Sequence, residues 1–221
     1  MEHASYHHGD LRNSLVDIGT ELLNTKGMTG ISLREIARTI GVGHNAPYRH
    51  FRNKQQLLEA IAEAGFRKLV ARNTRLELEF AHDPESQLFE SAMHIIIMAA
   101  EQPNLFQLMF GGGLQPQDCA GSLKEAADEA IQSLIRIIRS GQQQQVFIQR
   151  DPLKLALSAM SMIQGIAMMV SSGKLRPHPQ AAGSDVANWG DHPNVLKGMV
   201  LQLFDVFLLG IKIKNYKENK C

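Results

Sequence analysis

The 221-residue sequence has few cysteines and almost no net charge, and each shortage excludes a class of protein. Its two cysteines, Cys119 and Cys221, lie about a hundred positions apart, which excludes a disulfide framework and favours a reducing compartment. The 23 Lys+Arg against 22 Asp+Glu leave a formal net charge of +1, which excludes a polycationic nucleic-acid coat. With 44% hydrophobic residues, the composition is that of a globular protein with a core.

We also expect neither a secretory signal nor a membrane span. The polar N-terminus has no apolar core of a signal peptide, and one long uncharged run stands out, at residues 155–173. Its length suits a membrane span, but four serines and Gln164 interrupt it and no second span is expected. A helix buried against other helices is the better interpretation. We therefore expect a soluble, cytoplasmic protein with no membrane partner.

Motifs for catalysis and metal binding are absent from the sequence. It contains no nucleophile elbow, phosphate-binding loop or zinc-ligand spacing. The adjacent His7 and His8 would chelate a metal poorly, and Cys119 has no partner for redox chemistry. We expect no catalytic residue, no metal and no cofactor. An enzyme that uses Glu and His of the C-terminal half stays an alternative, without an acid–base pair to name.

The hydrophobic periodicity is helical almost throughout, and no strand pattern of any length occurs. Leu11, Leu15, Ile18 and Leu22 mark one face of a first helix, which Gly27 would end. A capping box, Ser32-x-x-Glu35, starts a second helix over 33–40. Further helices are expected at 44–51, from the Asn53 cap to about residue 80, and at 84–100, 103–110, 121–141, 152–172 and 194–214. The predicted fold class is all-α.

The charge is unevenly distributed along the chain. Residues 1–75 carry 11 basic and 7 acidic groups, a sum of +4, whereas residues 76–221 carry 12 and 15, a sum of −3. A basic run by itself is commonly a solvated helix face. Here, however, the helices at 33–40 and 44–51 and the glycine turn between them have helix-turn-helix dimensions. The second helix of such a motif enters the major groove, so the pattern predicts a DNA interface.

The stretch Ile31 to Ile61 resembles the DNA-binding domain of the tetracycline-repressor (TetR) family of bacterial regulators. The resemblance is carried by Glu35-Ile36-Ala37, Gly41-Val42, Tyr48-Arg49-His50-Phe51, Asn53-Lys54 and Leu57-Leu58. It implies an all-helical homodimer with a three-helix helix-turn-helix domain over residues 1–56. A long helix would join it to a larger helical ligand-binding and dimerisation domain over residues 57–221.

The resemblance also implies roles for single residues. The family positions that face bases are matched by Arg34, His44 and Asn45. Those that hold phosphates are matched by Ser32, Tyr48, His50 and Lys54. Gly43 and Pro47 depart from the family pattern and leave the start of the recognition helix open by a residue or two. The predicted DNA-binding set is Ser32, Arg34, His44, Asn45, Ala46, Tyr48, His50 and Lys54.

The C-terminal half shows a weaker similarity, to a subgroup named for a Trp-His-Gly motif. Met160 to Gly165 stands at the equivalent of that motif, with Met and Gln in place of Trp and His. Its clustered methionines suit an apolar ligand pocket, core packing or a dimer seam. Gln164 would contact either a ligand or the second protomer. The candidate residues for a small, partly apolar effector are Phe89, Met93, Phe106, Met109, Phe110, Gln164 and Met168.

The final helix repeats large apolar residues at helical spacing: Leu196, Val200, Leu203, Phe207 and Ile211. Paired with residues 155–170, this stripe would form a four-helix interface across a two-fold axis, unless it is buried within one protomer. The sequence therefore predicts a homodimeric, ligand-responsive transcriptional regulator, a repressor released from a palindromic double-stranded operator by a small molecule. The alternatives are the enzyme above and a non-specific nucleoid-type DNA binder.

Overall fold

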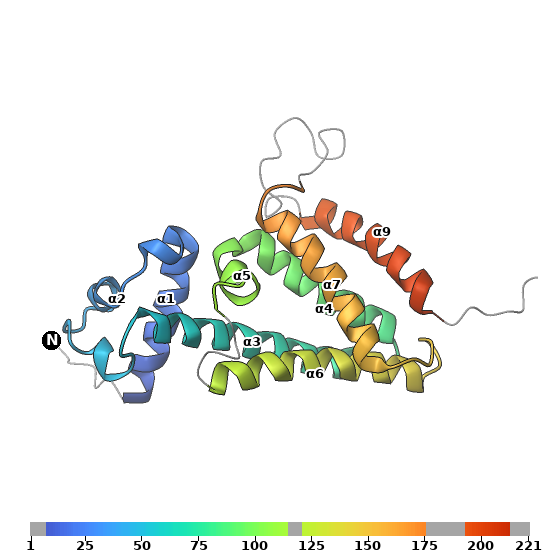
Figure 1. Ribbon diagram of the computed structural model, residues 1–221, viewed down its shortest axis with the longest axis horizontal. Coiled ribbons are helices and arrows are strands. Elements are labelled where there is room, and N and C mark those ends of the chain that lie inside the picture. The colour runs from blue at the N-terminus through green and yellow to red at the C-terminus, as the bar shows by residue number, and fades with distance from the viewer. Residues whose placement is uncertain (1–7, 115–120, 176–192, 213–221) are drawn as a thin grey trace, which may run out of the picture. The chain divides into compact units, whose positions relative to one another are not determined.

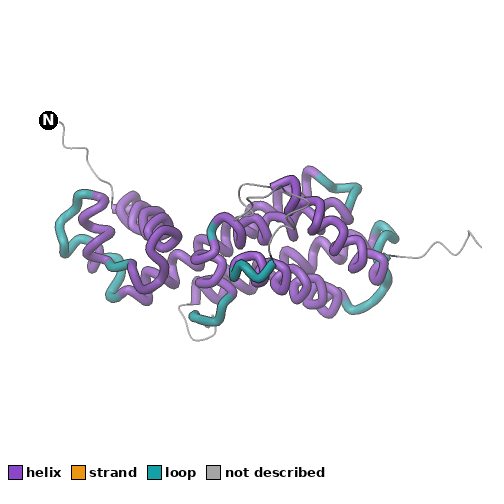
Figure 2. Tube along the Cα trace, turned by 90° about the horizontal axis from the view of Figure 1, so that it is seen from above, coloured by secondary structure: helices purple, strands orange, loops and turns teal. Residues whose placement is uncertain are grey.

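A computed structural model of the chain describes residues 8–114, 121–175 and 193–212. Within these ranges helices are joined by short loops (Figure 2), and the β-pairing is limited to an isolated antiparallel bridge between Phe147 and Lys212. The predicted all-α fold class is confirmed. Cys119, Cys221, His7 and most of the Pro/Gly-rich segment before residue 193 lie outside the described residues.

The helices follow the predicted order (Figure 1). They are α1 (His8–Gly30), α2 (Leu33–Ile40), the 3₁₀ helix η1 (Pro47–Arg49), α3 (Lys54–Glu79), α4 (Pro84–Glu101), α5 (Pro103–Phe110), α6 (Gly121–Gln143), α7 (Pro152–Ser171) and α9 (Pro193–Ile211). The helices from α4 onward begin within one residue of their predicted starts. Proline in the first helical turn explains this accuracy at α4, α5 and α7, because its missing N–H costs nothing there.

Residues 44–51 do not form the α-helix that the sequence predicts. They contain one short 3₁₀ helix, η1, and the amides of Ala46, Arg49 and His50 each donate to the carbonyl three residues earlier, at 2.9–3.2 Å. Pro47 has no N–H to donate to Gly43, and the N-terminus of η1 receives no hydrogen bond from a side chain. Without the Pro47 N–H and without a side-chain cap, the segment forms a short 3₁₀ helix, which is tighter than the expected α-helix.

Packing divides the chain into two compact units. Unit 1 comprises residues 1–68 and 102–127, and unit 2 comprises residues 69–101 and 128–221. The helices α3 and α6 therefore each contribute residues to both units. The functional boundary expected after residue 56 stays a prediction, since these units are defined by packing alone.

The core of unit 1 joins α1, α2, α5 and the first half of α3. Leu15, Leu23, Ile36 and Leu57 are fully buried at its centre. Gly19 lets α1 approach α3 closely, because a Cβ at this position would lie 2.9 Å from the Cδ1 of Ile61. The core thus fixes α2 against α1, and with it the segment predicted to contact DNA.

In unit 2, α4 packs against both α7 and α9 (Figure 1). The inner face of α9 is buried through Leu196, Val200, Phe204, Leu208 and Ile211. The predicted stripe is therefore split: Leu203 is 42% exposed and Phe207 only half-buried, whereas its other members are buried within the protomer. The observed buried face and the predicted stripe both have helical spacing, because α9 is apolar on nearly all of its faces.

Within the described ranges, two helices are long and apolar enough to cross a membrane: Pro152–Ser171 and Asn194–Ile211, each with a mean hydropathy of 1.6. Residues 155–173 are therefore not the only long apolar run among the described residues, whereas the absence of a second span stays a prediction. Length and composition alone are weak evidence for a span, because the core helices of soluble proteins share them. Both helices bury one face in unit 2 and expose the other.

Candidate nucleic-acid interface

The start of α2 is held by a cap and by an ion pair to α1. The Oγ of Ser32 accepts a hydrogen bond from the backbone N–H of Glu35 at 3.2 Å, as the capping box predicts. The carboxylate of Glu35 pairs with the ammonium of Lys26 at the end of α1. In a full capping box the backbone N–H of Ser32 would also donate to this carboxylate; among the described residues that bond is absent, so only half of the predicted box forms.

The Lys26 ion pair keeps Glu35 charged. The hydrogen bond that Lys26 donates is the main cause that lowers the pKa of Glu35, and the positive charges of Lys26 and Arg38 lower this pKa further. Glu35 is the one acidic side chain between residues 34 and 54. Its charge is therefore matched locally by Lys26.

A surface hollow opens beside α2 and is lined by Arg34, His44, Asn45 and Tyr48. All four belong to the predicted DNA-binding set, and we call this feature the α2 hollow. Arg34 comes from the first turn of α2, whereas the other three come from the turn before η1 and from η1 itself. No carboxylate of the described residues lines the hollow, and the Tyr48 side chain is 46% exposed. The fold therefore gathers base-reading and phosphate-binding candidates on one surface.

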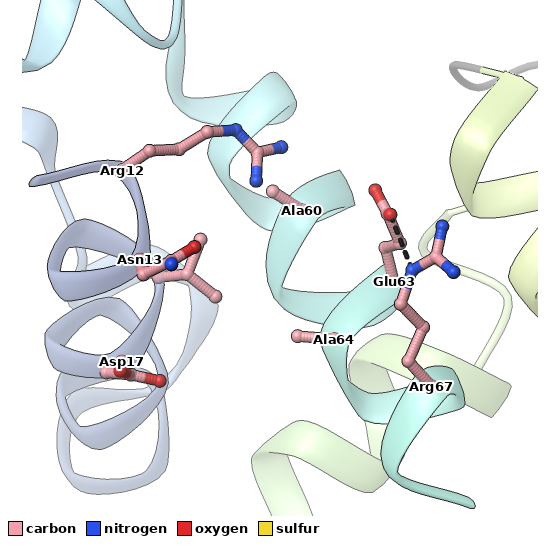
Figure 3. A pocket seen from close by; sticks show the side chains of 8 residues that line it. Arg12, Asn13, Asp17, Ala60, Glu63, Ala64 and Arg67 are labelled. Atoms are coloured by element: carbon pink, nitrogen blue, oxygen red, sulfur yellow. Dashed lines mark hydrogen bonds and ion pairs between the residues drawn. The ribbon is translucent and has the colours of Figure 1, made fainter. Parts of the chain in front are cut away.

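A second hollow in unit 1 has a different electrostatic character. It lies between α1 and α3 (Figure 3) and is lined by Arg12, Asn13, Val16, Asp17, Ala60, Glu63, Ala64 and Arg67. Its two cations are balanced by two carboxylates. Glu63 accepts from Arg67 Nε at 2.9 Å and from Ser122 Oγ at 2.9 Å. Since none of the described residues that line the α2 hollow is a carboxylate, a polyanion should bind there more favourably than at this balanced hollow.

The predicted phosphate ligands differ in their access to solvent, and one of them, Tyr48, lines the α2 hollow. The exposed Ser32 hydroxyl can still donate while its oxygen caps α2. Lys54 lies at the start of α3, and its Nζ donates to the carbonyl oxygen of Thr29 at 3.5 Å. The same helix start is capped by Asn53, whose Oδ1 accepts from the backbone N–H of Gln56 at 2.9 Å. Helix N-termini favour phosphate. The Nε2 of His50 is buried without a partner among the described residues, so this atom does not face a phosphate. Ala46 is half-buried beside the hollow.

Three of the candidate effector residues belong to unit 1. Phe106 is fully buried, with its ring 5.2 Å from that of Phe110, and Phe110 meets Phe66 of α3 edge-on at 5.4 Å. Met109 packs directly over Gly65, which leaves no room for a Cβ. These contacts are core packing between α5 and α3. Neither of the two hollows described above is lined by these residues.

The other four candidates belong to unit 2. Phe89 meets Phe204 of α9 edge-on at 5.5 Å, and Met93 is buried one turn further along α4. Gln164 is half-buried on α7, whereas Met168 is exposed on the outer face of that helix. The effector roles of all seven residues stay predictions.

Sequence reasoning missed the polar side chains inside unit 2. Asn73 of α3 donates to Ser133 of α6 at 2.8 Å, and both are buried. Gln87 and Ser91 lie one turn apart on α4 and are only 2% and 3% exposed. A polar group in an apolar interior is what a ligand's own polar group would contact. The four-residue spacing of Gln87 and Ser91 could have indicated a polar position on the inner face of α4, which attention to aromatic residues alone overlooks.

We expect the stability of the protein to fall as the pH drops below about 6.5, the ordinary histidine pKa. Burial in unit 2, assisted by the charge of Arg72, lowers the pKa of His94. Below the ordinary value the unfolded chain therefore takes up the proton more readily than the folded chain. Thermal unfolding between about pH 7.5 and 5.5 should show a smaller drop in Tm for His94→Gln than for wild type. His82→Gln, at an exposed position, should keep the wild-type drop.

Two family models match the chain. Residues 15–61 match the bacterial regulatory proteins of the tetR family, and residues 88–189 match the tetracyclin repressor-like C-terminal domain. The first range contains all eight predicted DNA-binding residues. The resemblance stated for residues 31–61 is confirmed, whereas the similarity to the Trp-His-Gly subgroup stays a prediction.

Individual proteins agree with these matches. The class C tetracycline repressor of Escherichia coli is 45% identical over 53 residues, and the chain spans only 24% of its length. A solved protein of unknown function from Rhodococcus sp. RHA1 is 30% identical, with a TM-score of 0.76 over 96% of this chain and 100% of that one. A TetR/AcrR regulator from Thermobifida fusca is 18% identical, with a TM-score of 0.65 over 91% and 98%, and supports the fold alone. The chain belongs to the tetR family of bacterial regulatory proteins.

Proposed function

We propose that the protein is a homodimeric, cytoplasmic transcriptional regulator, a repressor that binds a palindromic DNA operator and leaves it when a small molecule binds. The observation that carries this proposal is the α2 hollow, in which Arg34, His44, Asn45 and Tyr48 come together without a carboxylate. It lies within the segment that matches the tetR family model. Two such surfaces related by a two-fold axis would enter successive major grooves about 34 Å apart.

The dimer is proposed to form through the outer faces of α7 and α9. On α7 this face carries Leu157, Ser161, Gly165 and Met168, all exposed and uncharged. A Cβ at Gly165 would meet no described atom within 4 Å, so packing among the described residues does not require a glycine there. A glycine on an exposed apolar face suits close approach of a second helix. The exposed Asp205 in the middle of α9 argues against lipid as the covering partner.

The effector is proposed to bind in the C-terminal domain and to oppose DNA binding. Aromatic and methionine side chains would contact its apolar part, and the buried Gln87 and Ser91 would contact a polar group. Because α3 contributes to both units, it is the candidate lever between them. Effector and DNA must then weaken each other's binding equally, by a coupling of about 1–3 kcal/mol.

The two alternatives are less well supported. Family membership favours a regulator over an enzyme. A non-specific nucleoid-type binder needs cations alone, whereas the α2 hollow adds the amide of Asn45 and the phenol of Tyr48. These groups are suited to selective hydrogen bonding. Enrichment of one palindrome from random duplex DNA would separate the regulator from the nucleoid-type binder, and conversion of a bound small molecule would favour the enzyme.

Removal of the Lys54 ammonium should weaken binding to every DNA sequence. Each neutralised phosphate contributes about 0.9 to the slope of log affinity against log salt, so Lys54→Ala should lower the slope by roughly this amount per site. Fluorescence anisotropy with a labelled duplex over a salt series measures the slope. Lys68→Ala is the matched control, since Lys68 is exposed on the same helix but lies almost four turns away. Equal slopes for Lys54→Ala and wild type would contradict a phosphate contact by Lys54.

A further inference from the structure

The side chains of the α2 hollow point to the bases that the protein reads. We infer that in each half-site Arg34 binds a guanine and Asn45 binds an adenine, with the two bases within about three base pairs of each other. This inference rests on the proposed function and goes beyond it, since it assigns the operator chemistry to two residues. It follows from three features: the free donors of Arg34, the unused amide of Asn45 and the one hollow that they share.

Arg34 has a guanidinium with no competing carboxylate. It is exposed, and it forms no ion pair with any residue that the structure describes. Its neighbour Glu35, the nearest acid in sequence, is held by Lys26 instead. A guanidinium offers donors only, and in the major groove guanine presents two adjacent acceptors, O6 and N7. Adenine and cytosine present a donor there, and thymine presents a single acceptor, O4, beside a methyl group. Guanine alone accepts both prongs of the fork, so it is the base that Arg34 selects.

Asn45 has an amide that the protein itself does not use. Two other asparagines of unit 1 are engaged: Asn53 Oδ1 caps α3, and Asn104 Nδ2 donates to the carbonyl of Asn24 at 3.0 Å. The side chain of Asn45 is exposed in the α2 hollow and makes no hydrogen bond within the described residues. Its one donor group and one acceptor match the N7 acceptor and N6 donor of adenine.

The two contacts must lie close together along the DNA. Arg34 and Asn45 line one hollow with a volume of about 680 Å³. Because the two side chains border one space, we expect them to reach bases within about three steps of the 3.4 Å base-pair rise. His44 and Tyr48 line the same space and limit it further. The guanine and the adenine are therefore near neighbours in the half-site.

The test uses the full-length protein and a library of random duplexes. Sequences enriched by the wild type should contain the guanine and adenine within about three base pairs in each half-site. Dissociation constants are then measured for single base-pair changes at each position, with wild type, Arg34→Met and Asn45→Ala. Wild type should lose about 5- to 150-fold at either position. Arg34→Met should lose discrimination at the guanine and keep it at the adenine, and Asn45→Ala should show the reverse.

Two variants control for charge and for side-chain loss. Arg38→Met removes an exposed cation one turn along α2, and Asn13→Ala removes an exposed amide of α1; neither residue lines the α2 hollow. Both should keep the discrimination at both bases, while Arg38→Met weakens all sequences alike. If the wild type enriches no sequence, the proposed function fails and this inference with it. An enriched motif without the pair, or discrimination that survives in its cognate variant, overturns the inference alone.

Discussion

Leu203→Asp should convert the protein to monomers that bind operator DNA poorly. Leu203 is 42% exposed on α9, on a flank shared with Met199, Val206 and Gly210 at spacings of four, three and four. In the proposed dimer this flank is covered, so an aspartate there would bury an unpaired charge at a cost of about 3 kcal/mol or more. The dimer dissociation constant should rise at least about 100-fold. Sedimentation equilibrium over a concentration series measures it, with DNA affinity as the second readout.

Leu201→Asp is the matched control for this variant. Leu201 is 46% exposed on the same helix, but it lies on the opposite flank with Lys197 and Asp205. Lys197 pairs with Glu90 of α4 at 3.2 Å, so this flank already borders the protomer's own charged surface. We expect Leu201→Asp to remain a dimer. Dissociation by both variants to the same extent, or by neither, would place the interface elsewhere.

Gly141→Ala should destabilise the protein by about 2–3 kcal/mol, although alanine normally favours a helix interior by about 1 kcal/mol over glycine. Gly141 lies in the last turn of α6, and the ring of the fully buried Phe147 packs directly on it. The amides of Val146 and Phe147 both donate to the carbonyl of Gly141, at 2.9 and 3.1 Å, which prevents the loop from moving away. Urea unfolding followed by circular dichroism measures the change.

Two further variants separate the proposed clash from a general effect of the substitution. Gly198→Ala, in α9 at a position with no atom within 4 Å, should be neutral or stabilise by up to about 1 kcal/mol. Phe147→Leu should lose some packing by itself but should relieve the Gly141→Ala penalty in the double variant. Additive effects of the two substitutions would show that Phe147 is not the cause.

The limits of sequence reasoning are clearest in α9 and in the DNA-reading segment. Leu203 and Phe207 have the same helical spacing as Phe204 and Leu208, so periodicity could not tell which pair α4 covers. At residues 44–51 the motif was recognised correctly, but the missing donor of Pro47 reduces the expected α-helix to η1. For His50 the residue type suits a phosphate contact, whereas burial decides that its Nε2 does not face one.

The low net charge and the missing motifs excluded other classes of protein. Helical spacing then predicted the all-α class, and the Tyr48 to Lys54 segment indicated the family. These features are local, since caps, proline positions and short motifs act within a few residues. The tertiary structure decided which side chains share a surface: it placed Arg34 with Asn45 in the α2 hollow and Glu35 with Lys26. It also buried Phe106 and Met109 in the core of unit 1. Such contacts join residues far apart in the chain, and only packing fixes them.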